Sequence, residues 1–171
     1  MQINVNIKYK DLVLISILLF PRLRSNWILL GIFTICIFLF IYFQKVHYTS
    51  TDYIITLLAS VIGSIVGILS TLFFNIIIML LSINKRSGIL GEHNYTITKE
   101  GLHEITTVNE STQKWSGVKS IKMINNYIYF HIYANLFHII PGRFFTDKNH
   151  FKQFYNEALQ LKNSAKKQEN Q

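Results

Sequence analysis

Two long stretches of the chain, residues 26–43 and 53–83, contain no charged side chain. A helix of about 20 apolar residues crosses the hydrocarbon core of a bilayer, and about 18 can suffice. Lipid offers no hydrogen-bond partner to the backbone, so a crossing segment must satisfy its own N–H and C=O groups, as a helix does. The two stretches, separated by a short loop, therefore predict a transmembrane helical hairpin.

Basic residues flank this hairpin, whereas the loop between its two spans has only Lys45. Those on the flanks are Lys8, Lys10, Arg22, Arg24, Lys85 and Arg86. Lysine and arginine near membrane helices favour the cytoplasmic side. We therefore expect a multi-pass protein with both termini in the cytoplasm.

The second span carries a series of small and polar residues at every fourth position. The series is Ala59, Gly63, Gly67, Thr71 and Asn75. Small residues at this spacing let two helix backbones approach closely in lipid. The series predicts packing either against the first span of the same chain or along the seam of a homodimer. Neither span contains Asp, Glu, Lys, Arg or His, which argues against a proton or ion transporter.

The segment before the hairpin, residues 1–25, predicts a strand followed by an interfacial helix. Polar and apolar residues alternate over 2–8, with Ile3, Val5 and Ile7 on one face, as in a half-buried strand. A sheet for this strand to join is predicted only after residue 91, so we expect it there as an added edge strand. The apolar run 12–20 is too short to span a bilayer and predicts a helix in the inner interface.

Beyond residue 91 the chain changes to short alternating segments, which predict antiparallel strands. We place them at 94–98, 102–108, 113–123, 127–133 and 136–140, with turns at 99–101, 109–112, 125–126 and 134–135. An amphipathic helix follows, with Thr146 as its N-cap. Its apolar face comprises Phe151, Phe154, Tyr155, Ala158 and Leu161.

These elements predict an α+β membrane protein. A hairpin at 26–86 precedes a small antiparallel domain of pleckstrin-homology-like architecture at 91–163, closed by the C-terminal helix. The polar residues 164–171 are expected to form a flexible tail.

Sequence motifs in the predicted domain carry a family resemblance. They are the stretch 91–104 (GEHNYTITKEGLHE), the NES of 109–111, the Trp-Ser pair at 115–116 with Val118 and Ile121, and 139–145 (IIPGRFF). In order and spacing they resemble the YcxB-like family of bacterial membrane proteins, although Gly117 departs from its pattern. The resemblance implies two membrane helices before the domain and a place in the bacterial cytoplasmic membrane, and the family has no established biochemical activity. It also implies that the shared residues Gly101, Trp115, Pro141 and Arg143 serve folding.

The sequence contains no motif that indicates chemistry. Its six histidines lack the local spacing of a zinc site, although His131 and His138 lie on adjacent predicted strands. A P-loop, a dinucleotide-binding glycine pattern and a nucleophile elbow are all missing from the sequence. We therefore expect no enzymatic activity, no metal and no cofactor. The basic residues are scattered, and nucleic acid is not expected as a partner.

Two function hypotheses from different classes remain. The first is a membrane-anchored interaction module that holds a protein partner or anionic lipid heads. Its candidate basic surface comprises Lys119, Lys122, Arg143, Lys148 and Lys152. The second is a structural or oligomerising subunit that associates through its transmembrane hairpin.

Overall fold

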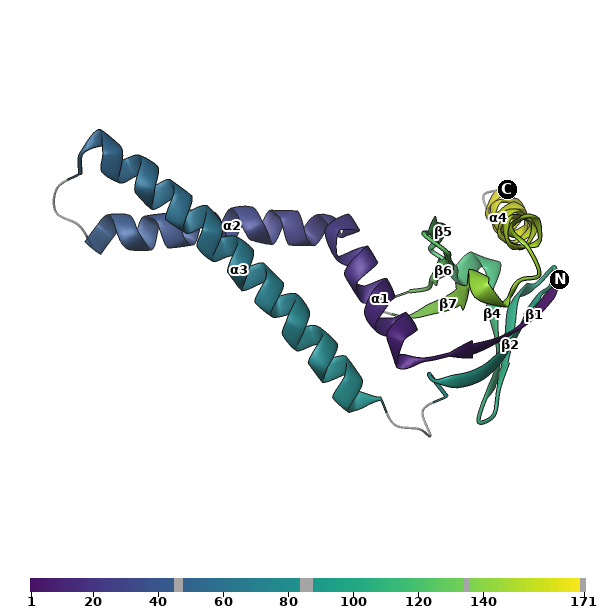
Figure 1. The fold of residues 1–171 in the computed structure, drawn as a ribbon. Helices are drawn as coiled ribbons and strands as arrows, with labels where there is room; N and C mark the ends of the chain where they lie inside the picture. The colour runs from purple at the N-terminus through teal and green to yellow at the C-terminus, as the bar shows by residue number, and fades with distance from the viewer. Residues whose placement is uncertain (45–47, 84–87, 134–135, 170–171) are drawn as a thin grey trace. The chain divides into compact units, whose positions relative to one another are not determined.

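A computed structural model describes residues 1–44, 48–83, 88–133 and 136–169 of the chain (Figure 1). The chain forms two compact units, one of Met1–Leu12 with Ile83–Gln171 and the other of Val13–Ser82. Two long apolar helices are followed by antiparallel sheets and a C-terminal helix, so the predicted α+β class and this order of elements are confirmed. The predicted boundaries of the four segments stay a prediction. The turn expected at 134–135, the loop residue Lys45 and the flanking residues Lys85 and Arg86 lie outside the described residues.

The helical unit contains the two predicted long helices, α2 (Arg24–Gln44) and α3 (Ser50–Ser82). They pack on one another as a hairpin. Before them come α1 (Tyr9–Leu19), which crosses the boundary between the units, and the short helix η1 (Phe20–Arg22). Thr49 caps α3, because its hydroxyl accepts a hydrogen bond from the backbone N–H of Asp52 and the Asp52 carboxylate accepts one from the N–H of Thr49. This reciprocal pair defines where α3 begins.

The first sheet of the other unit has four antiparallel strands in the order β1-β2-β3-β4. They are β1 (Gln2–Ile7), β2 (Gly91–Ile97), β3 (Gly101–Thr106) and β4 (Glu110–Lys114). The strand predicted near the N-terminus does join the sheet at its edge, with Asn4 opposite Asn94. Ile3, Val5 and Ile7 are buried, so the alternation in the sequence correctly indicated the inward face.

The second sheet has three antiparallel strands, β5 (Ser120–Ile124), β6 (Tyr127–His131) and β7 (Phe137–Pro141). The single strand predicted at 113–123 is wrong, because this segment divides into β4, the short helix η2 (Trp115–Gly117) and β5. Trp115 turns into the core and donates its indole N–H to the Thr98 carbonyl at 3.0 Å, which bends the chain out of one sheet and into the other. The predicted turn at 125–126 is confirmed, with Asn125 in the left-handed region at φ 51°.

The helix α4 (Lys148–Glu169) closes the unit and packs against η2, β5, β2 and β3. Phe151, Phe154 and Ala158 are buried beneath it, as its apolar periodicity predicted. The N-cap is Asp147 rather than Thr146, because the Asp147 carboxylate accepts hydrogen bonds from the N–H groups of residues 149 and 150, at 2.7 and 2.8 Å. The helix continues to Glu169, through most of the segment expected to be a flexible tail.

Candidate functional site

Three of the four residues that the chain shares with the family, Gly101, Trp115 and Pro141, have structural roles in the fold. Trp115 is fully buried, and Pro141 ends β7 opposite Tyr127. Gly101 ends the predicted turn at 99–101 without a positive φ, which among the described glycines is found at Gly88 and Gly91. Its small size is needed instead for close approach of β4, because a Cβ atom at this position would lie 2.1 Å from the backbone oxygen of Gln113.

The fourth shared residue, Arg143, bonds to a carboxylate from the N-terminal segment. It lies in the short helix η3 (Gly142–Phe144) and donates from Nη2 to Asp11 Oδ2 at 2.7 Å and to the Asn6 carbonyl at 3.1 Å. Asp11 is fully buried and also accepts from the Tyr127 hydroxyl at 2.8 Å and from the Lys8 N–H at 2.9 Å. The arginine therefore ties the start of α1 and the end of β1 to η3.

The electrostatics of this Asp11 network favour the ion pair. Burial alone would raise the pKa of Asp11, but the hydrogen bonds from Arg143, the Lys8 N–H and Tyr127 outweigh it and hold the pKa below its usual value. The hydrogen bond to Asp11 raises the pKa of Arg143, and burial together with the same carboxylate raises the pKa of Tyr127. Arg143, expected on a free basic surface, is thus committed to an internal carboxylate.

A second buried polar cluster joins the two sheets, and the sequence did not indicate it. Glu104 on β3 accepts hydrogen bonds at Oε1 from His93 Nδ1 on β2, at 2.8 Å, and from His138 Nδ1 on β7, at 3.3 Å. The hydroxyl of Tyr95 lies 3.4 Å from His93 Nδ1 and also interacts with the Glu104 carboxylate. From the sequence, only His93 and Tyr95 could have been placed together, because residues two apart on a strand share one face.

The cluster keeps Glu104 ionised. Burial opposes the charge, but the hydrogen bonds from His138, His93 and Tyr95 outweigh it and hold the pKa of Glu104 well below its usual value. Burial and the neighbouring Glu104 charge raise the pKa of Tyr95 well above its usual value. Because a carboxylate only accepts, each imidazole donates its Nδ1–H to Glu104. His93 Nε2 is then buried without a hydrogen-bond partner in the described part of the chain.

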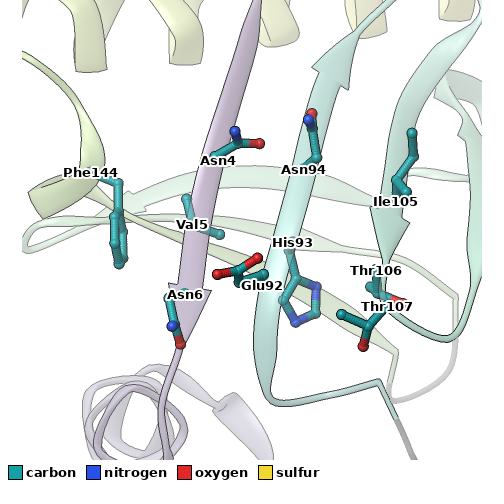
Figure 2. A pocket seen from close by; sticks show the side chains of 10 residues that line it. All are labelled: Asn4, Val5, Asn6, Glu92, His93, Asn94, Ile105, Thr106, Thr107 and Phe144. Atoms are coloured by element: carbon teal, nitrogen blue, oxygen red, sulfur yellow. The ribbon is translucent and has the colours of Figure 1, made fainter.

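Two hollows meet at His93. One is a cavity of about 310 Å³ lined by the Glu104 cluster and by apolar residues that include Ile7, Leu12 and Phe137. The other is an open groove of about 520 Å³ across β1, β2 and β3 (Figure 2). Amide side chains face this groove, Asn4 from β1 and Asn94 from β2, and His93 borders both hollows. The arrangement provides hydrogen-bonding positions for a polar group, but no nucleophile with a positioned base.

His131 and His138 lie on adjacent strands, as predicted, but they do not face each other. The register places His131 opposite Phe137 and His138 opposite Phe130, so the two imidazoles project from opposite faces of the sheet. His131 lies near the Tyr129 ring, whereas His138 points to Glu104. Among the residues that the structure describes, no group of three or more His, Cys, Asp or Glu side chains could hold a metal ion.

The small-residue series of the second span lies mostly away from α2. Thr56, Ser60 and Ser64 are the buried residues of α3, and Ser64 accepts a hydrogen bond from the Thr34 hydroxyl of α2 at 3.1 Å. Of the series, a Cβ atom added at Gly63 would lie 3.4 Å from Ile37, and one added at Gly67 would have no neighbour within 4 Å. The remaining members, Ala59, Thr71 and Asn75, are exposed.

Of the predicted basic surface, the four lysines are exposed. They lie before β5 (Lys119), on β5 (Lys122) and at the start of α4 (Lys148 and Lys152).

Comparison with known protein families agrees with the motifs of this unit. Residues 97–157 match the YcxB-like protein family. The match confirms the family resemblance over this segment, which runs from the end of β2 into α4. It includes Glu104 and Arg143, whereas their partners His93 and Asp11 precede it. Comparisons with curated proteins and with solved structures gave no significant match.

Proposed function

We propose that this is an integral protein of the bacterial cytoplasmic membrane and that its two-sheet unit is a non-enzymatic interaction module in the cytoplasm. The observation that carries the proposal is the uncovered apolar surface of the helical hairpin. No residue of α2 is buried, and the buried residues of α3 are Thr56, Ser60 and Ser64. Both helices are long and apolar enough to cross a membrane.

The low burial of these helices favours membrane spans over core helices of a soluble domain. A core helix of that length would be largely covered by protein, whereas Phe40, Ile62 and Leu81 keep 67%, 61% and 81% of their surface exposed. Soluble monomers rarely expose a contiguous apolar patch larger than a few hundred Å². Lipid is the cover that this surface fits. Tyr42, Tyr48 and Tyr53 cluster at one end of the hairpin, with ring centroids 5.0–6.2 Å apart, which suits a headgroup boundary.

For the module we propose pleckstrin-homology-like architecture. Sheets of four and three antiparallel strands, with a single C-terminal helix packed against both, support this assignment. A structure of the unit determined by experiment and superposed on domains of that class would test it.

The single cysteine of the chain provides a test of membrane insertion. Cys36 lies in α2 and is exposed on the protein surface. If α2 spans the bilayer, a membrane-impermeant maleimide should fail to label Cys36 in membranes and should label it after denaturation. Alkaline carbonate should leave the protein in the membrane pellet. Rapid labelling of Cys36 in intact membranes would refute the insertion.

The predicted membrane topology can be tested by labelling single introduced cysteines in a Cys36→Ala background. Ser50→Cys at the start of α3 should react from outside in intact spheroplasts, whereas Ser111→Cys on β4 should react only after lysis. The reverse pattern would place the module outside and reject the cytoplasmic assignment.

A photo-crosslinking amino acid can test whether the module has a partner at the groove of Figure 2. At Asn94, which faces the groove, it should give a discrete adduct in cells, whereas at Ser111 on the edge strand β4 it should not. Equal products at both positions, or none at either, would reject the groove as an interaction surface.

A second candidate function, association through the hairpin, is favoured by the small-residue series of α3, of which Ala59, Thr71 and Asn75 are exposed. Gly67→Leu fills open space within one chain, so it should leave the monomer intact and abolish crosslinked dimers in membranes. Gly31→Leu on α2 also enters open space and is the matched control. Dimers that persist in Gly67→Leu would exclude this seam.

A further inference from the structure

A hollow beside the C-terminal half of α4 collects three lysines, two of which the sequence had not singled out. Its volume is about 230 Å³, and its lining combines Lys119, Lys162 and Lys166 with Trp115, Ser116, Val118 and Tyr133. The packing of α4 on η2 creates the hollow, and the i, i+4 spacing of Lys162 and Lys166 puts both on one face of the helix.

The lysines of this hollow are not neutralised within the described part of the chain. No carboxylate is among the lining residues, and the ion pairs of the described side chains involve none of these three ammonium groups. Like charges held close together repel one another, and two at i, i+4 on a helix destabilise it. A hollow lined by three lysines and by no carboxylate therefore favours an anion from outside the chain.

The helix dipole explains only part of this cluster. Cations stabilise a helix near its C-terminus, but the effect is confined to the last turn, where Lys166 and Lys167 lie. Lys162 is one turn earlier, and Lys119 is not on the helix. Ser116 and Tyr133 also line the hollow, and each carries a hydroxyl group that can donate a hydrogen bond.

We propose that the hollow formed by Lys119, Lys162 and Lys166 binds a phosphate group. The lining residues include three lysines and two residues with a hydroxyl group, which are donor types that suit a small tetrahedral oxyanion, whose oxygens all accept hydrogen bonds. The phosphate can be that of an anionic phospholipid headgroup or a free phosphate. This site deepens the proposed interaction function of the two-sheet unit, but it does not depend on insertion of the hairpin.

The test is a calorimetric titration of the full chain in a neutral maltoside detergent. One arm uses inorganic phosphate, and the other uses soluble dihexanoylphosphatidylglycerol with dihexanoylphosphatidylcholine as the uncharged comparison. The test variant is Lys119→Gln/Lys162→Gln/Lys166→Gln. Its matched control, Lys10→Gln/Lys99→Gln/Lys114→Gln, removes the same charge from exposed lysines of the same unit that neither line the hollow nor belong to the candidate basic surface.

The site predicts saturable binding by the unmodified chain in at least one arm. Loss of three charge-assisted hydrogen bonds should weaken this binding at least about tenfold in the test variant, and less than about twofold in the control. Binding in the phospholipid arm alone identifies a headgroup site, and binding of inorganic phosphate identifies a phosphate site proper. Absence of binding in both arms, or equal weakening by the two variants, overturns the proposal.

Folding of the variants is checked by a second measurement. Trp27→Phe leaves Trp115 as the sole tryptophan, so its fluorescence reports on this unit and on the hollow that it lines. If the triple variant unfolds, Lys119→Gln alone is titrated, with Lys99→Gln as its control. Because calorimetry in detergent is independent of membrane insertion, failure here is distinguishable from failure of the Cys36 labelling test.

Discussion

Removal of the Arg143 charge should destabilise the two-sheet unit more than removal of any charge on its exposed surface. In Arg143→Met the side chain keeps an apolar stem, while Asp11 remains fully buried with hydrogen bonds only from Tyr127 and the Lys8 N–H. Breaking a buried ion pair on one side costs about 3–5 kcal/mol. The arginine side chain is 33% exposed, so we take the lower end, about 3 kcal/mol. For a domain of this size that is a fall in Tm of roughly 12–24 °C.

The assay is thermal and chemical unfolding of the full chain in detergent, followed by Trp115 fluorescence in a Trp27→Phe background. Lys122→Met removes an exposed cation and should change the free energy of unfolding by less than about 0.5 kcal/mol. Asp11→Asn combined with Arg143→Met should cost less than the sum of the single changes, by about 1–3 kcal/mol. Two outcomes would refute the conclusion that this pair holds the unit together. One is that the losses in the free energy of unfolding of the single variants add up in the double variant, and the other is that Arg143→Met loses less than about 1 kcal/mol.

Further outcomes follow from other contacts of the same unit. The pKa of Glu104 is lowered by folding, so its contribution to stability is present above the unfolded value, near 4.5, and is lost as the pH falls below it. Glu104→Gln should therefore weaken the fall in the free energy of unfolding between pH 6 and pH 3. An unchanged pH dependence would exclude Glu104 as the source of this fall. Gly101→Ala places a Cβ atom 2.1 Å from a backbone oxygen of β4 and should cost about 1–3 kcal/mol in denaturant unfolding. Gly117→Ala meets only a flexible glutamine side chain and should cost clearly less, so equal losses would contradict the argument. Asp147→Ala removes two N-terminal hydrogen bonds of α4 and should lower helicity by circular dichroism, unlike Thr146→Ala.

Elements with strong local periodicity could be predicted from the sequence. The charge-free runs became α2 and α3, the alternation over 2–8 became β1, and the apolar periodicity after residue 148 became α4. The division of segment 113–123 could not be predicted from the sequence. It depends on Trp115, whose indole N–H donates to the carbonyl of Thr98, far away in the sequence. A continuous β-type pattern does not reveal where the chain leaves one sheet for another.

The candidate sites were harder to predict than the elements. Arg143 was predicted both as a shared folding residue and as a candidate for the basic surface, and a sequence does not reveal that Asp11 lies opposite it. The cluster around Glu104 draws side chains from β2, β3 and β7, and no local spacing links them. The lysine hollow joins Lys119 to Lys162 through the packing of α4 on η2.

By itself the sequence determined which segments are apolar enough to form long helices, which faces of β1 and α4 are buried, and which residues match the family. These properties depend on neighbours within a few positions along the chain. The tertiary structure decided the partners of the charged groups: Arg143 with Asp11, Glu104 with His93 and His138, and three lysines around one hollow. An ionised side chain must be hydrogen-bonded or solvated wherever the fold places it, and that place is set by the packing of strands and helices far apart in sequence.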